Sequence, residues 1–209
     1  MEIERRFTDV KELRMSEDGN IIEGYPIVYD QETNIGGWFR EKIAQGAATE
    51  ALKTSDEFVL FNHDPNFPLA RRSNGSLEVI EDEHGVKIKA DLSKSARGRE
   101  VHEMVKAGLI NKMSFAFTTD KESWTYAQAE GETDLRVVEK FRELFDYSPV
   151  VYPAYKQTEL QARSAKDILD SREAPAGDEQ PGAPEEAEDY LGKLDVYEKE
   201  IQFILGDTK

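Results

Sequence analysis

Two polar side chains stand in otherwise apolar segments and could together perform nucleophilic catalysis. Ser114 lies in the run Met-Ser-Phe-Ala-Phe at 113–117, and His63 closes the run Phe-Val-Leu-Phe-Asn-His at 58–63. A serine hydroxyl becomes a useful nucleophile when a neighbouring base takes its proton, and imidazole titrates near neutral pH. The pair predicts a serine hydrolase. The commoner roles of such residues are a buried serine bonded to the backbone and a histidine in a core or at a turn.

The chain has three histidines, so few residues can serve as the base. His84 lies in the polar run Glu-Asp-Glu-His-Gly at 81–85, which predicts a solvent-exposed turn. His102 falls within a predicted helix but off its apolar stripe, which predicts a surface position. His63 is therefore the best base on its surroundings alone.

Strand alternation gives the serine two different faces. The large residues at 113, 115 and 117 point one way, whereas Ser114 and Ala116 point the other. The large side chains can anchor the strand in a core, and the small Ala116 leaves room beside the hydroxyl for an extended substrate.

A third group should orient the imidazole and stabilise its cationic form. Asp146 lies in the apolar run Leu-Phe-Asp-Tyr-Ser-Pro-Val at 144–150. Burying a carboxylate costs several kcal/mol unless a partner compensates, so its position suggests such a partner. Glu143, of opposite strand parity, is the alternative acid.

Composition excludes several classes of function. The 209 residues include no cysteine, which rules out thiolate nucleophiles, disulfides and zinc ribbons. The formal net charge of −16 argues against nucleic-acid binding, which needs clustered Lys and Arg. No histidine and acid spacing matches a metal-ligand set and no phosphate or dinucleotide loop occurs, so we expect neither a metal nor a cofactor. We also expect no membrane span and no signal peptide, because long apolar runs are lacking and the first residues are charged.

The expected elements are many strands with one or two helices between them. Gly108 should end the longer helix, which Ser93 or Ser95 would cap, and Gly85 should take positive φ in the turn of a hairpin. The strands are predicted at 2–14, 21–29, 57–63, 76–80, 86–92, 110–118, 135–138 and 141–151, and the helices at 43–53 and from 93 or 95 to 107. This order favours a mainly β, α+β fold with a closed or strongly curved sheet flanked by helices.

The end of the chain differs from the rest. Residues 164–209 hold thirteen acids and five bases, and the first part of this stretch is rich in Pro, Gly, Ala and Glu. We predict a domain at 1–163, an acidic linker at 164–186 and an amphipathic helix at 187–206. That helix would dock on the domain, on a copy of itself or on a partner.

Several short motifs, in this order and spacing, together resemble the prohead (procapsid) maturation proteases of tailed bacteriophages. They lie at 23–25, 46–47, 61–64, 68–71, 74–77, 108–115, 145–150 and 153–155. The family is regarded as distantly related to the herpesvirus assembly proteases, the assemblins, which are serine enzymes on a small closed β-barrel with surrounding helices.

The resemblance implies roles for individual residues. Ser114 matches the nucleophile, His63 the general base, and Asp146 an acid just before a Ser-Pro-Val-like strand. Arg71 or Arg72, near the histidine strand, could stabilise the oxyanion, but a structural ion pair explains either one equally well.

The resemblance also implies a setting. The enzyme would act in the host cytoplasm, inside the assembling procapsid, and cleave the scaffolding segment of the major capsid protein, or a separate scaffold protein, and itself. The helix at 187–206 could hold the enzyme there. Because the herpesvirus enzymes act as dimers, the resemblance is also compatible with a homo-oligomer. The alternative is a catalytically inactive assembly scaffold protein on the same fold.

Overall fold

The computed structural model describes residues 3–8, 14–15, 20–129, 131–151 and 168. The predicted linker and C-terminal helix therefore lie outside the described residues, apart from Ile168. Within the described part, one α-helix, α1 (Ala96–Lys106), and two single 3₁₀ turns, η1 (Ala51–Lys53) and η2 (Leu92–Lys94), accompany the strands. The strands are β1 (Glu4–Thr8), β2 (Arg14–Met15), β3 (Ile21–Val28), β4 (Thr33–Ile35), β5 (Phe39–Ile43), β6 (Phe58–Phe61), β7 (Asp64–Arg71), β8 (Leu77–Glu81), β9 (Gly85–Asp91), β10 (Lys112–Thr125) and β11 (Leu135–Val150).

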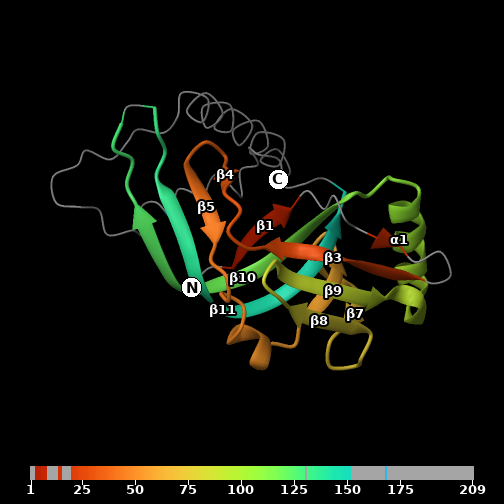
Figure 1. The fold of residues 1–209 in the computed structure, drawn as a ribbon. Coiled ribbons are helices and arrows are strands. Elements are labelled where there is room, and N and C mark those ends of the chain that lie inside the picture. Colours follow the sequence, from red (N-terminus) through yellow and green to blue (C-terminus); the bar gives the residue numbers. More distant parts are fainter. Residues whose placement is uncertain (1–2, 9–13, 16–19, 130, 152–167, 169–209) are drawn as a thin grey trace, which may run out of the picture.

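The described strands form two sheets, so the expected mainly β, α+β class is confirmed (Figure 1). The larger sheet has the order β1-β10-β11-β5-β4, with β6 also on β11 and β7 on β6, and the smaller has the order β2-β3-β9-β8. The resemblance implied a closed barrel, but neither sheet closes on itself in the described part. The physical reason is pairing: β3 forms its ladder with β9, and among the described strands no ladder joins β1 to the opposite edge of the larger sheet.

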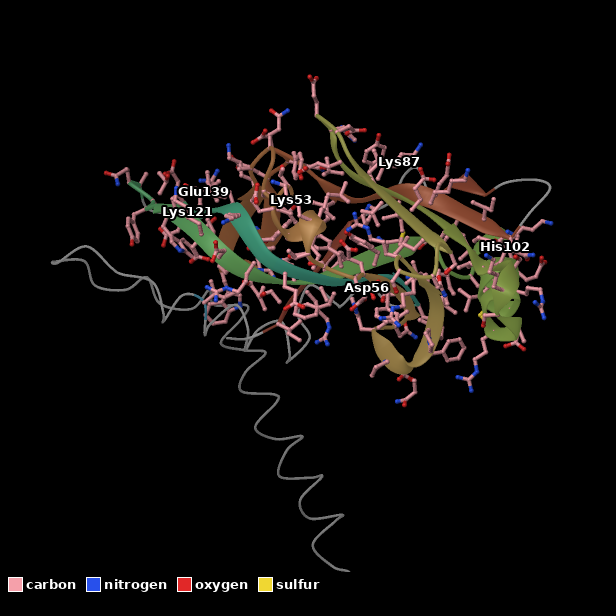
Figure 2. The ribbon with its side chains drawn as sticks, turned by 90° about the horizontal axis from the view of Figure 1, so that it is seen from below. Lys53, Asp56, Lys87, His102, Lys121 and Glu139 are labelled. Carbon is pink, nitrogen blue, oxygen red and sulfur yellow. The ribbon has the colours of Figure 1, made fainter. Side chains whose placement is uncertain are left out.

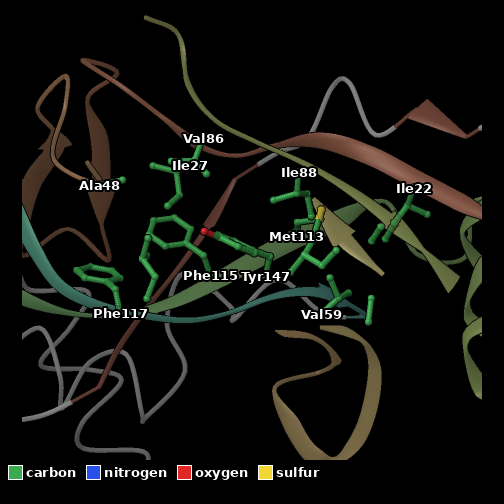
Figure 3. Close-up of a cluster of buried hydrophobic side chains, with 14 of the residues drawn as sticks. Ile22, Ile27, Ala48, Val59, Val86, Ile88, Met113, Phe115, Phe117 and Tyr147 are labelled. Atoms are coloured by element: carbon green, nitrogen blue, oxygen red, sulfur yellow. The ribbon is translucent and has the colours of Figure 1, made fainter. Parts of the chain in front are cut away.

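Two long antiparallel strands, β10 and β11, run side by side through the larger sheet (Figure 1). Their large side chains at 113, 115, 117 and 147 face the core and pack toward Ile27, Val86 and Ile88 of the smaller sheet (Figure 3). The alternation predicted for the serine strand is therefore confirmed on its core side.

The helix predicted to end near Ala107 is α1. The Ser95 hydroxyl accepts a hydrogen bond from the Gly98 amide at its start, and Gly108 has φ 73° just beyond its end. The part of the chain that the structure describes includes no helix long and apolar enough to cross a membrane.

The helix predicted at 43–53 is wrong. Ile43 ends β5, turns follow, and only the single turn η1 is helical. Gly46 adopts φ +80°, which interrupts helical geometry, and the backbone bonds instead to β11, through Ala44 N to Val138 O and Phe141 N to Ala47 O.

The β8–β9 hairpin is confirmed, but the reason for its glycine differs from the prediction. Gly85 has φ 159°, close to extended backbone. A Cβ there would lie 2.0 Å from the carbonyl oxygen of Ile27 on β3, so close strand approach is what requires glycine.

Candidate active site

His63 lies in a two-residue hairpin turn rather than at the end of a strand. Phe61 and Asp64 pair across β6 and β7, and Asn62 and His63 between them have φ 53° and 57°. Two positive φ values are the mark of a type I′ turn, which matches the twist of the flanking strands. Asn and His are among the few non-glycine residues enriched in that region of backbone space.

The side chain and backbone of Asn62 fasten this turn to the end of β11. The Asn62 amide donates to the Pro149 carbonyl at 3.1 Å, and the Asn62 side-chain oxygen accepts from the Val151 amide at 3.0 Å. The turn that carries His63 is thus held on the strand that carries Asp146.

Ser114, His63 and Asp146 form one chain of hydrogen bonds. His63 Nε2 lies 2.6 Å from Ser114 Oγ, and His63 Nδ1 lies 2.6 Å from Asp146 Oδ1. An ionised carboxylate only accepts, so Nδ1 carries a proton; in the neutral ring Nε2 is then free to accept the Ser114 proton. Ser114 is 3% and Asp146 5% exposed, and the His63 side chain is 12% exposed, so solvent competes little for these bonds.

Ser148 is a fourth member of this network that the sequence analysis missed. It stands directly opposite Ser114 in the β10–β11 ladder, is fully buried, and its hydroxyl donates to Asp146 Oδ1. Asp146 Oδ1 therefore accepts from both His63 and Ser148. Strand alternation in the sequence could have indicated Ser148, because residues 146 and 148 of one strand point to the same face.

The Ser114 hydroxyl has a second acceptor, the backbone carbonyl of Arg6 on β1, at 2.9 Å. A hydroxyl has one proton, so it donates to neutral His63 or to Arg6. When His63 is protonated, its Nε2–H donates to Ser114 Oγ and the hydroxyl turns to the Arg6 carbonyl. Strand β1 is thus part of the site.

A buried cluster of charged side chains on the core side of the sheet links β1 to its neighbours. Arg6 and Arg136 share the carboxylates of Glu4 and Glu41, and Arg136 also pairs with Glu122. Burial by itself raises the pKa of Glu4, but the hydrogen bond from Arg136 and the charge of Arg6 outweigh it and lower that pKa to about 2. Burial by itself lowers the pKa of Arg6 and Arg136, but the charges of Glu41 and Glu4 outweigh it and raise both pKa values, so both guanidinium groups stay charged.

Comparison with protein families gives the same assignment as the site. The family model described as caudovirus prohead serine protease matches residues 7–171. The chain belongs to this family. Comparisons with curated proteins and with solved structures found no significant match. Membership indicates a serine protease that acts in the phage procapsid within the host cell, with capsid proteins as partners.

The other residues considered for the site of this prohead protease do not join the hydrogen-bond chain of Ser114, His63 and Asp146. Glu143 is exposed on β11, and the acid hydrogen-bonded to His63 is Asp146. Arg71 pairs with Asp56, and Arg72 with the buried Glu57, which is the ion-pair role left open above. Ala116 faces the same way as Ser114 and is buried, in contrast to the open position expected from the sequence.

His102 is buried, so its predicted surface position is wrong. It lies on α1 (Figure 2), is 5% exposed, and its Nδ1 is 3.5 Å from the Glu103 carboxylate. The buried face of α1 comprises Gly98, Val101, His102 and Val105, since the helix packs on η2 and β7. His84 is exposed, as predicted.

No set of three or more His, Cys, Asp or Glu side chains within the described ranges could hold a metal ion.

Proposed function

We propose that the chain is a prohead maturation endopeptidase in which Ser114 is the nucleophile, His63 the general base and Asp146 the group that orients the imidazole. The observation that carries the proposal is the hydrogen-bond chain Ser114–His63–Asp146, with both bonds at 2.6 Å. Family membership supports the reaction class.

The chemistry follows from the proton positions. Ser114 Oγ attacks the scissile carbonyl carbon while its proton passes to His63 Nε2, and Asp146 stabilises the imidazolium that results. His63 then gives this proton to the leaving amine as the peptide bond breaks. Water repeats the sequence on the acyl-enzyme: His63 takes its proton, and Ser114 leaves with that proton restored.

The proposed substrates are the scaffolding segment of the major capsid protein, or a separate scaffold protein, and the enzyme itself. The proposed organisation is a protease domain at 1–163, a linker at 164–186 where self-cleavage can occur, and a helix at 187–206 that holds the enzyme in the procapsid. A chain truncated after residue 165 should then be packaged poorly into procapsids. Packaging equal to that of the full chain would refute the targeting role and favour a helix docked on the domain.

Co-expression with the capsid protein tests the catalytic assignment. Ser114→Ala and His63→Ala should each abolish processing, because members of such a unit typically contribute about 10⁴- to 10⁶-fold in rate. Asp146→Asn should lose less, and Glu143→Gln should process like the parent. Full processing by Ser114→Ala would refute the nucleophile, and a larger loss in Glu143→Gln than in Asp146→Asn would refute the acid. A parent chain that processes nothing would favour an inactive assembly protein.

A further inference from the structure

Two buried polar atoms, one on β1 and one on β10, have no hydrogen-bond partner in the part of the chain that the structure describes. They are Nε of Arg5, on β1, and Oγ1 of Thr118, on β10. Thr118 is 6% exposed and Arg5 is partly exposed. A donor or hydroxyl left unpaired away from water costs free energy, so such atoms gain when an acceptor arrives.

Strand register places both groups on the face of the sheet that carries Ser114. Arg5 pairs directly with Ala116, and residues paired across an antiparallel ladder share a face. Along β10, Ser114, Ala116 and Thr118 alternate with the core-facing Phe115 and Phe117. Arg5 and Thr118 thus both flank Ala116.

The buried carboxylates near this face already bind other side chains. On the opposite face, Arg6 pairs with Glu4 and Glu41, so those acids serve the core cluster. Asp146, across Ala116, already accepts from His63 and Ser148. No ion pair joins Arg5 to any described carboxylate, in contrast to its neighbour Arg6.

Glu143, opposite Thr118, is an exposed acid of this face. Its charge disfavours an acidic ligand on its own side of Thr118, so a ligand carboxylate should approach from the Arg5 side. A guanidinium binds a carboxylate through two parallel N–H donors, and a hydroxyl can add a third bond.

We infer that Arg5 and Thr118 form a substrate subsite that binds an acidic side chain of the peptide being cleaved. The inference rests on Ser114 being the nucleophile, as proposed above. Ala116 is two residues from Ser114, about 7 Å along the strand, and side chains on one face of an extended peptide have that same spacing. The acidic residue therefore lies within about two positions of the scissile bond. Residues 164–209 of the chain, with thirteen acids, have the chemistry of such a substrate.

Peptide binding tests the subsite without requiring cleavage. The probes are a fluorescent peptide of residues 171–189 and its counterpart with every Glu changed to Gln and every Asp to Asn, measured by anisotropy on the full chain. The acidic peptide should bind about 10- to 100-fold more tightly, the range for a charge-assisted hydrogen bond. Arg5→Gln should remove this preference and Thr118→Val should reduce it. Arg99→Gln, an exposed arginine on α1, should keep it.

Equal binding of the two peptides by the parent, or an unchanged preference in Arg5→Gln, would overturn the subsite. Cleavage of a peptide library is the second readout: the parent should favour Glu or Asp at one position, and Arg5→Gln should lose that preference but not the ability to cleave other peptides. Labelling of Ser114 by a fluorophosphonate separates the two proposals. Failure to label would refute the nucleophile, whereas normal labelling with no acid preference would refute only the subsite.

Discussion

Removing the charge of Glu4 should destabilise the protein in a pH-dependent way. Glu4 is buried beside Arg6 and Arg136, and its pKa is lowered from 4.5 to about 2 although burial opposes this. By linkage, that difference corresponds to about 3 kcal/mol of stability. Direct removal of one partner from a buried ion pair typically costs about 3–5 kcal/mol, so the two estimates agree.

The sign of this pH dependence follows from the direction in which the pKa of Glu4 is shifted. A carboxyl whose pKa is lower in the folded chain contributes its full stabilisation above the unfolded value, here about pH 4.5, and loses it as the pH falls toward 2. Glu4→Gln should therefore be about 3 kcal/mol less stable than the parent at pH 7, and the difference should shrink progressively below pH 4.5.

Urea unfolding at pH 7, 4 and 3, followed by fluorescence of the two tryptophans, measures the effect. The matched control is Glu139→Gln, which removes the partner of the exposed Lys121 at the protein surface (Figure 2) and should leave the unfolding midpoint unchanged. A Glu4→Gln variant as stable as the parent at pH 7 would refute the reasoning. A deficit of the same size at pH 7 and pH 3 would show that packing, not charge, is the cause.

Three further substitutions test the parts that position the site. Ser148→Ala should lower kcat/KM by about tenfold through loss of its bond to Asp146, with the fold unchanged by circular dichroism; undiminished kcat/KM would exclude a positioning role. Asn62→Ala should lower kcat at constant KM and more than Asn62→Gly does, since glycine retains the positive φ; equal losses would mean that the turn geometry is not what matters. Gly85→Ala should cost at least about 1–3 kcal/mol in urea unfolding, because its Cβ would meet the Ile27 carbonyl; a neutral effect would contradict the close approach of β9 and β3.

Local pattern predicted the elements that are determined locally. The alternation around Ser114, the β8–β9 hairpin, and the capped helix with Gly108 beyond its end all agree with the structure. Predictions that depended on partners distant in sequence were less successful. The helix predicted at 43–53 does not form, because the backbone of this segment bonds to β11 instead. His102 is buried because α1 packs on elements that helical periodicity does not identify.

The sequence by itself determined which residue types could perform the reaction: a serine and an acid in apolar strands, and one histidine left after two others were set aside. Only the tertiary structure decided how they meet. The His63 turn reaches Asp146 because Asn62 holds it on β11, and Ser148 enters through cross-strand register. Contacts that span 83 residues between His63 and Asp146 follow from strand pairing, and no local property of either segment encodes them.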